Sequence, residues 1–308
     1  MRPANGAGGT IAPCGFKDAF RCCTVVLEYT IGAFPVTEWL TRFIGSGVIV
    51  LSLTCAVHAA PAVDIPSTPA SQPASAAGSP LNAQVRAAVE PAEAAAKEAD
   101  RKAMQARTQQ AAAQMAAARA REAAAKAEAN AKGYGVLTGT GTSDSKPTWR
   151  YEGQVRASKE NGFGVEAWTS GERNEGEFKD DAENGVMVSV YPSGTRYEGE
   201  FRNARRSGVG VYIWTDGDRY EGEFNNASRN GLGTYYGGDT KDYTAKSGQW
   251  VNGRLTGYAV IFWKDGTRSV GVFRDDRLDG YGARFDTQGH LIEQGLYEDG
   301  ALKTALTP

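Results

Sequence analysis

The sequence predicts a mainly β protein: an elongated antiparallel sheet of stacked β-hairpins, preceded by a long alanine-rich α-helix and a disordered N-terminal region. Three observations support this prediction. The hexapeptide RYEGEF occurs at residues 196–201 and again at 219–224. Residues 92–132 contain neither glycine nor proline and are rich in alanine, lysine, arginine, glutamate and glutamine. Residues 61–80 are dominated by proline, serine and alanine, a composition typical of a disordered or extended linker.

The N-terminal 60 residues indicate export. Residues 1–40 form an extension with no repeat, and our hypothesis is that the start codon was assigned too early. Within 41–60, Arg42 precedes 15 apolar residues, from 43 to 57, which is fewer than the roughly 20 that span a bilayer. Val57 and Ala59 are small residues at the positions that favour cleavage after Ala59. We therefore expect a signal peptide and a periplasmic or envelope-associated protein, with an uncleaved single-pass N-terminal membrane anchor as the alternative.

The four cysteines support the same assignment. Cys14, Cys22, Cys23 and Cys55 all lie in the first 55 residues, so the remaining chain has no disulfide and no thiolate zinc site. A domain without thiols suits an oxidising compartment, because it has no stray thiol to oxidise.

A long helix is expected within residues 81–132. Alanine and straight-chain side chains are the strongest helix formers, and the EAAAK segments at 93–97 and 122–126 are typical of semi-rigid helical spacers. Pro91 suits a first helical turn, and Gly133 suits the stop. Large apolar side chains are scarce, Met104 and Met115 being the main ones. This composition favours a solvated spacer, with weak self-association through an alanine-seamed coiled coil as the alternative.

Residues 133–308 form a repeat domain. Anchor glycines recur at intervals of 23, 23, 23, 26, 23 and 24 residues, at positions 153, 176, 199, 222, 248, 271 and 295. Between them lie second runs such as NGFGVEAW (161–168) and SGVGVYIW (207–214). Period-two alternation places Tyr197, Gly199 and Phe201 on one side of a strand, so each unit is expected to be a hairpin. Because an isolated hairpin is marginally stable, stacked copies would bury one another, and the glycine would leave room for a ring.

These motifs resemble the MORN repeat family, whose units of about 23 residues are hairpins that stack into an elongated, twisted antiparallel sheet. The resemblance covers about seven units over 149–300, is strongest in units three and four, good in one and two, and weaker in five to seven. Lys246 and Ser269 replace the expected tyrosine there, and an insertion begins at 235–238. Residues 133–141 and the last eight residues are expected to cap the sheet. The repeat-defining residues are Tyr151, Gly153, Gly176, Phe178, Tyr197, Gly199, Phe201, Tyr220, Gly222, Phe224, Gly248 and Gly271.

No catalytic constellation stands out. Glu198 and Glu200 resemble a carboxylate pair, but the pair recurs in neighbouring units, which indicates a charged outer face paired with Arg173, Arg196 and Arg219. The two histidines of the chain, at 58 and 290, cannot build a histidine metal cluster. We therefore expect no enzyme, no cofactor and no metal site. The repeat region has 21 Lys and Arg against 26 Asp and Glu, so nucleic acid is not an expected partner.

Two function classes remain. MORN proteins are generally adaptors, so the first is an interaction scaffold of the cell envelope that binds an unidentified protein or a membrane component. The alternative is a carbohydrate or cell-wall binding module, because such modules also use short aromatic hairpins. Aromatic residues at near-repeat spacing form the candidate binding surface, although they could instead be core, covered by the twist of the sheet or by the helix. They are Trp168, Tyr191, Trp214, Tyr235 and Trp263.

Overall fold

The computed structural model describes residues 81–140 and 148–308, which lie in one compact unit. The predictions for 1–40, for the signal or anchor segment 41–60 with cleavage after Ala59, and for the linker 61–80 fall outside the described residues. Within the part of the chain that is described, no helix has both the length and the apolar character needed to cross a bilayer.

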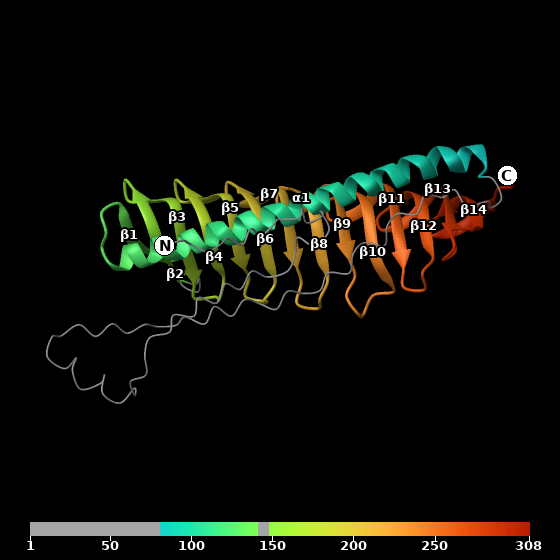
Figure 1. Cartoon of the computed structure of the whole chain (residues 1–308). Coiled ribbons are helices and arrows are strands. Elements are labelled where there is room, and N and C mark those ends of the chain that lie inside the picture. The colour runs from blue at the N-terminus through green and yellow to red at the C-terminus, as the bar shows by residue number, and fades with distance from the viewer. Residues whose placement is uncertain (1–80, 141–147) are drawn as a thin grey trace, which may run out of the picture. The chain divides into compact units, whose positions relative to one another are not determined.

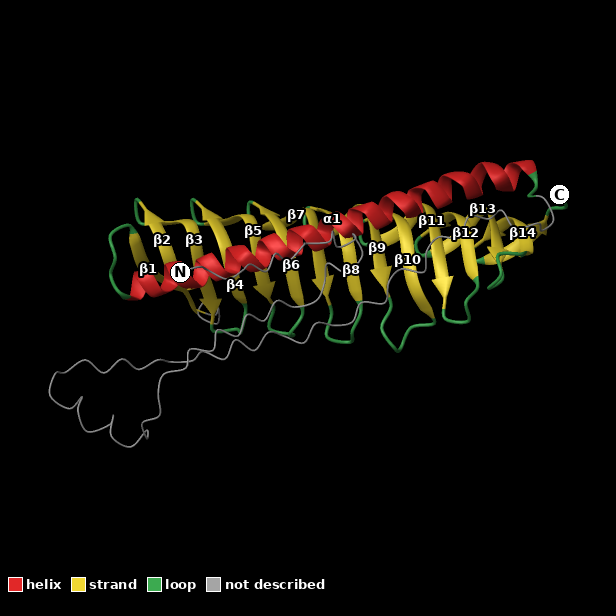
Figure 2. Cartoon of the chain, viewed as in Figure 1, coloured by secondary structure: helices red, strands yellow, loops and turns green. Residues whose placement is uncertain are grey.

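One helix and one sheet make up this unit (Figures 1 and 2). Helix α1 spans Ala83–Glu128. The strands are β1 (Tyr134–Thr140), β2 (Thr148–Arg156), β3 (Lys159–Trp168), β4 (Arg173–Lys179), β5 (Ala182–Val190), β6 (Arg196–Arg202), β7 (Arg205–Ile213), β8 (Arg219–Asn225), β9 (Ser228–Tyr236), β10 (Tyr243–Val251), β11 (Arg254–Trp263), β12 (Arg268–Arg274), β13 (Arg277–Phe285), β14 (Leu291–Glu298) and β15 (Ala301–Ala305).

The sheet confirms the predicted fold. Its 15 strands follow one another in chain order, and each pairs antiparallel with its neighbours. Strands β2 to β15 form seven successive hairpins, and β1 and β15 are the two edges, as expected of the capping segments. The insertion predicted to begin at 235–238 is a loop between β9 and β10, although residues 235 and 236 still belong to β9. The two residues at each tight turn explain the hairpins, because Asn203 and Ala204 have φ values of 48° and 60°, as a type I′ turn requires.

Tyrosine rings lie directly over paired glycines, so the glycines leave room for a ring as predicted, but the ring was expected from an adjacent strand and comes from the same one. Gly199 faces Gly210 across the β6–β7 pair. A Cβ atom at Gly199 would lie 2.6 Å from the Gly210 Cα and 2.7 Å from the Tyr197 hydroxyl. The ring comes from the same strand as Gly199, two residues earlier, and the Tyr197 hydroxyl donates a hydrogen bond of 3.0 Å to the carbonyl of Glu200. Tyr151 and Tyr220 make the equivalent bonds.

Helix α1 lies within the predicted range 81–132, but Pro91 does not mark its first turn. Its N-cap is Asn82, whose side chain accepts a hydrogen bond from the Gln84 backbone N–H, so Pro91 lies inside the helix and not in its first turn. Proline removes the hydrogen bond to the carbonyl four residues before it. That carbonyl belongs to Ala87, which is exposed to solvent, while the buried Val85 and Val89 hold this first part of the helix on the sheet.

The interpretation of α1 as a solvated spacer is wrong, because α1 lies along the sheet and contacts every strand from β1 to β14 (Figure 1). Small side chains let it approach closely. Its buried residues recur at three- and four-residue spacing and are Val85, Ala88, Val89, Ala92, Ala96, Ala99, Ala103, Ala106, Ala113, Ala116, Ala117, Ala120, Ala123 and Ala127. The alanine seam expected to allow self-association is therefore used within the chain.

Polar side chains of α1 at seven-residue spacing meet successive hairpins. Arg121 Nη1 lies 3.0 Å from a Glu175 carboxylate oxygen, Gln114 donates to Glu198 at 2.8 Å, and Arg107 lies 2.8 Å from Glu221. Asp100 and Glu93 continue the series toward Ser247 and Arg268. The predicted pairs with Arg173, Arg196 and Arg219 also form. The face is not an outer one, however, because α1 covers it and leaves Glu198 only 2% exposed.

Candidate binding face

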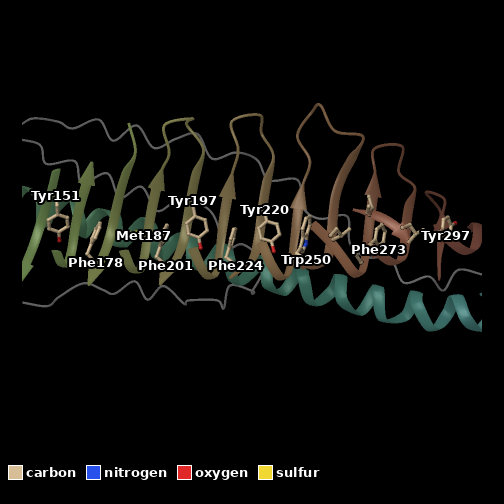
Figure 3. Close-up of a cluster of buried hydrophobic side chains, with 14 residues drawn as sticks. Tyr151, Phe178, Met187, Tyr197, Phe201, Tyr220, Phe224, Trp250, Phe273 and Tyr297 are labelled. Atoms are coloured by element: carbon tan, nitrogen blue, oxygen red, sulfur yellow. The ribbon is translucent and has the colours of Figure 1, made fainter. Parts of the chain in front are cut away.

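The second face of the sheet, called the ring face here, is lined by aromatic side chains. Its buried core includes Tyr151, Tyr197, Tyr220, Phe224 and Trp250, and no residue of α1 belongs to this cluster. Figure 3 shows the row of side chains crossing successive strands. Alternation along each strand explains the two faces, because Glu198 points toward α1 and the neighbouring Tyr197 and Gly199 point away from it.

The five predicted aromatic residues are half-buried, and all of them except Trp168 pack against the core of the ring face. Trp214 is central, because its ring centroid lies 4.5 Å from Tyr212 and 5.2 Å from Tyr235. Tyr191 packs on Tyr212 at 6.2 Å. Trp168 is separate from this row and packs on Trp149 at 6.3 Å. Helix α1 therefore does not cover these aromatic residues. The alternative that they form a core beneath the helix is wrong.

Tyr235 is not at the position assumed from its spacing. It pairs across the strands with Tyr220, just as Tyr212 pairs with Tyr197. Tyr235 is therefore the counterpart of Tyr212 and not of Trp214. Near-repeat spacing misled the sequence argument because the fourth unit has a glycine at the true counterpart position, Gly237. The side chains of Trp214 and Tyr235 still share a face. Tyr235 is the counterpart of Tyr212, and Tyr212 and Trp214 are two residues apart, so they point to the same side of the sheet.

Two arginines fill the spaces between these rings. The Arg206 guanidinium lies 4.8 Å from the Tyr212 ring centroid and donates to the Tyr191 hydroxyl at 2.9 Å. Arg229 lies 4.8 Å from the Trp250 centroid and 5.5 Å from that of Trp214. Guanidinium groups attract the faces of aromatic rings, so these contacts fix the rings in place and add positive charge to the centre of the ring face.

The repeat position occupied by Arg206 and Arg229 holds a different type of residue in the other units of the sheet. Seven residues after each anchor glycine, the successive units have Glu160, Glu183, Arg206, Arg229, Leu255, Leu278 and Leu302. In the first two units this position belongs to a group of carboxyls. Burial, and then the nearby Glu166 and Asp181, raise the pKa of Glu160 to about 8, and burial also raises the pKa of Glu183. Sequence reasoning missed this group, although the change of residue type at one repeat position was the available signal.

A cavity of about 580 Å³ opens on the ring face at hairpins β10–β11 and β12–β13 and at β14. Trp263 is the candidate residue that lines it, and its indole Nε1–H donates to the Ser269 hydroxyl at 2.9 Å. Sequence reasoning did not predict the cavity. It had nevertheless identified its cause, because Ser269 is one of the two residues that replace tyrosine in the later units.

The described residues contain no group of three or more His, Cys, Asp or Glu side chains arranged to hold a metal ion. The MORN repeat family model matches four segments of the chain, residues 151–173, 197–219, 220–240 and 247–268. These segments lie in the first, third, fourth and fifth hairpins. The second hairpin, which has Asn174 where the others of the first four have tyrosine, is outside the matched segments. No curated protein matches the chain.

Proposed function

Because the chain is a MORN repeat-containing protein, we propose that it is a non-catalytic interaction scaffold of the cell envelope, binding a protein or a membrane surface through the ring face. MORN repeats mediate binding to proteins or membranes and are a non-catalytic module. The location in the envelope rests on the apolar segment 43–57 and its small-residue cleavage site.

One observation carries the choice of surface. Helix α1 seals one face of the sheet, and among the described residues no element packs over the other. That other face presents half-buried rings such as Trp214 and Tyr235, together with Arg206 and Arg229. Tryptophan, tyrosine and arginine dominate the energetics of protein interfaces, because they combine large contact area with few rotamers or with several hydrogen-bond donors. The ring face is thus the surface best suited to a partner.

The test is retention of the full chain on an envelope extract from its source, with and without the change Trp214→Ala. The matched control is Met115→Ala, which removes a side chain that is 62% exposed on the outer side of α1. We expect Trp214→Ala to abolish retention and Met115→Ala to leave it unchanged. Because Trp214 contacts Tyr212 and Tyr235, a moderate loss of stability of about 1–2 kcal/mol is also expected, and both variants must still melt cooperatively.

Lost retention in Met115→Ala, with full retention in Trp214→Ala, would move the binding surface to α1 and overturn the proposal. Binding of the purified chain to lipid vesicles would identify a membrane as the surface that is recognised. Binding to isolated cell-wall polysaccharide, without any protein or lipid, would instead support the carbohydrate-binding alternative.

A further inference from the structure

The cavity on the ring face has a counterpart elsewhere in the sheet that is filled. In the fourth unit, the Tyr220 ring packs edge-on against Phe224 and Trp250, with centroids 5.3 Å away in each case. The sixth unit has Ser269 at the position of Tyr220, and the cavity opens beside it. The cavity therefore opens beside the position at which this unit lacks a ring.

The surrounding residues agree position by position. Phe273, Leu278 and Arg284 of the sixth unit correspond to Phe224, Arg229 and Tyr235 of the fourth unit. Tyr297, in the unit after the sixth, corresponds to Trp250, in the unit after the fourth. Trp263, in the unit before the sixth, corresponds to Trp214, in the unit before the fourth. All five line the cavity. Leu278 covers the glycine pair Gly271 and Gly282, as Tyr220 covers Gly222 and Gly233, and its Cδ1 would lie 2.9 Å from a Cβ atom at Gly282. Space for a ring remains, because serine and leucine together are much smaller than tyrosine and arginine.

The polar groups of the cavity suit a neutral ring with an oxygen atom. The charged side chains that line the cavity are Asp242, Asp265, Asp276, Lys264, Arg277 and Arg284. Because three are acidic and three are basic, the cavity favours neither an anion nor a cation. The Nε of Arg284 is buried and has no hydrogen-bond partner among the described residues. A buried donor without an acceptor is unfavourable, so an oxygen placed there would be stabilised.

We propose that this cavity, called the ring socket here, binds the phenol ring of a tyrosine side chain that a partner protein inserts. The socket rests on the proposed function for its biological role, but its chemistry is independent of it. The inserted ring lies beside Leu278, between Phe273 and Tyr297, and its hydroxyl accepts a hydrogen bond from Arg284. The partner thereby completes a degenerate repeat.

The test uses N-acetyltyrosinamide as the probe and the full chain labelled with ¹⁵N, observing the indole N–H of Trp263. We expect the probe to shift this signal saturably, with a dissociation constant in the millimolar range that is typical of a single small ring. Ser269→Tyr supplies the missing ring from within the chain and should weaken the probe at least tenfold while raising the melting temperature. Met115→Tyr, which adds the same ring on the exposed side of α1 and away from the socket, should bind within twofold of the unchanged protein.

A second pair of variants protects the test against misfolding. Trp263→Ala removes a wall of the socket and should weaken the probe at least fivefold, whereas Trp168→Ala changes the equivalent tryptophan of the first unit and should have no effect. Because Trp263→Ala lacks the observed indole, binding to this pair is followed by the shift of the Arg284 Nε–H signal. Unchanged affinity in both Ser269→Tyr and Trp263→Ala would overturn the proposal, as would tighter binding of a neutral disaccharide than of the phenol probe. The proposed function and the ring socket can be refuted independently. If Trp214→Ala leaves envelope retention intact while the probe still binds the socket, the proposed function is wrong and the socket is supported.

Discussion

Replacing Ala113 of α1 with leucine tests whether the helix is part of the folded core. Ala113 is fully buried and packs with Ala117 against Val188 of β5. Leucine would add three carbon atoms at a fully buried position between the helix and the sheet, and such overpacking destabilises proteins by about 1–3 kcal/mol. On a solvated helix the same change would be almost neutral, because leucine forms helices nearly as well as alanine, with a difference of about 0.2 kcal/mol.

The matched control is Ala111→Leu, two residues earlier on the same helix, where the side chain is exposed. Chemical denaturation followed by circular dichroism, for the helix, and by tryptophan fluorescence, for the sheet, gives the free energy of unfolding for each variant. We expect Ala113→Leu to lose about 1–3 kcal/mol by both signals and Ala111→Leu to lose less than about 0.5 kcal/mol. Equal stability of the two variants would refute the docking of α1 on the sheet.

Three further changes test other contacts. The raised pKa of Glu160, about 8, means that the folded state keeps a proton that the unfolded chain loses above about pH 4.5, so stability should fall from pH 5 to pH 8. Glu160→Gln should flatten that fall in melting temperature, and an unchanged slope would contradict the burial of this carboxyl. Gly199→Val should lose about 3 kcal/mol by clashing with backbone, against about 1 kcal/mol for Gly217→Ala, where only positive φ is strained; similar losses measured by denaturation would count against the ring-over-glycine packing. Arg107→Ala should lose about 2 kcal/mol, since Glu221 is fully buried, and no loss in thermal unfolding would mean that the ion pair contributes nothing.

The hairpins could be predicted from the sequence because their determinants are local. In RYEGEF, charged residues alternate with aromatic residues and glycine, and this pattern is typical of a strand. Pairs such as Asn203 and Ala204 form the turn that follows it. Packing between neighbouring hairpins repeats the same contacts, so the sheet follows once one unit is understood. The ring socket could not be predicted in the same way. When serine replaces the tyrosine at residue 269, the space is either left as a cavity or filled by a neighbouring side chain, and only the structure distinguishes these outcomes.

The docking of α1 was missed for a different reason. Its contact stripe is made of alanine, which contributes little apolar area for each residue and resembles the composition of a solvated spacer. A flat sheet face lets the helix backbone approach closely, and there small side chains pack well. The recurring Glu175, Glu198 and Glu221 also looked like a face for water, because nothing in one strand shows that arginine and glutamine from a distant helix will meet them.

One signal in the sequence does connect the helix to the sheet. Glu93, Asp100, Arg107, Gln114 and Arg121 are seven residues apart, and each meets the next hairpin along the sheet. Seven helical residues rise about 10.5 Å, and two strands advance about 9.6 Å, so a slightly inclined helix crosses one hairpin in each heptad. The 46 residues of α1 span about 69 Å, close to the roughly 67 Å between the first and last of 15 strands. The period and length of the helix thus match those of the sheet, which is the relation expected of a helix that seals one face along its full length and leaves the ring face for a partner.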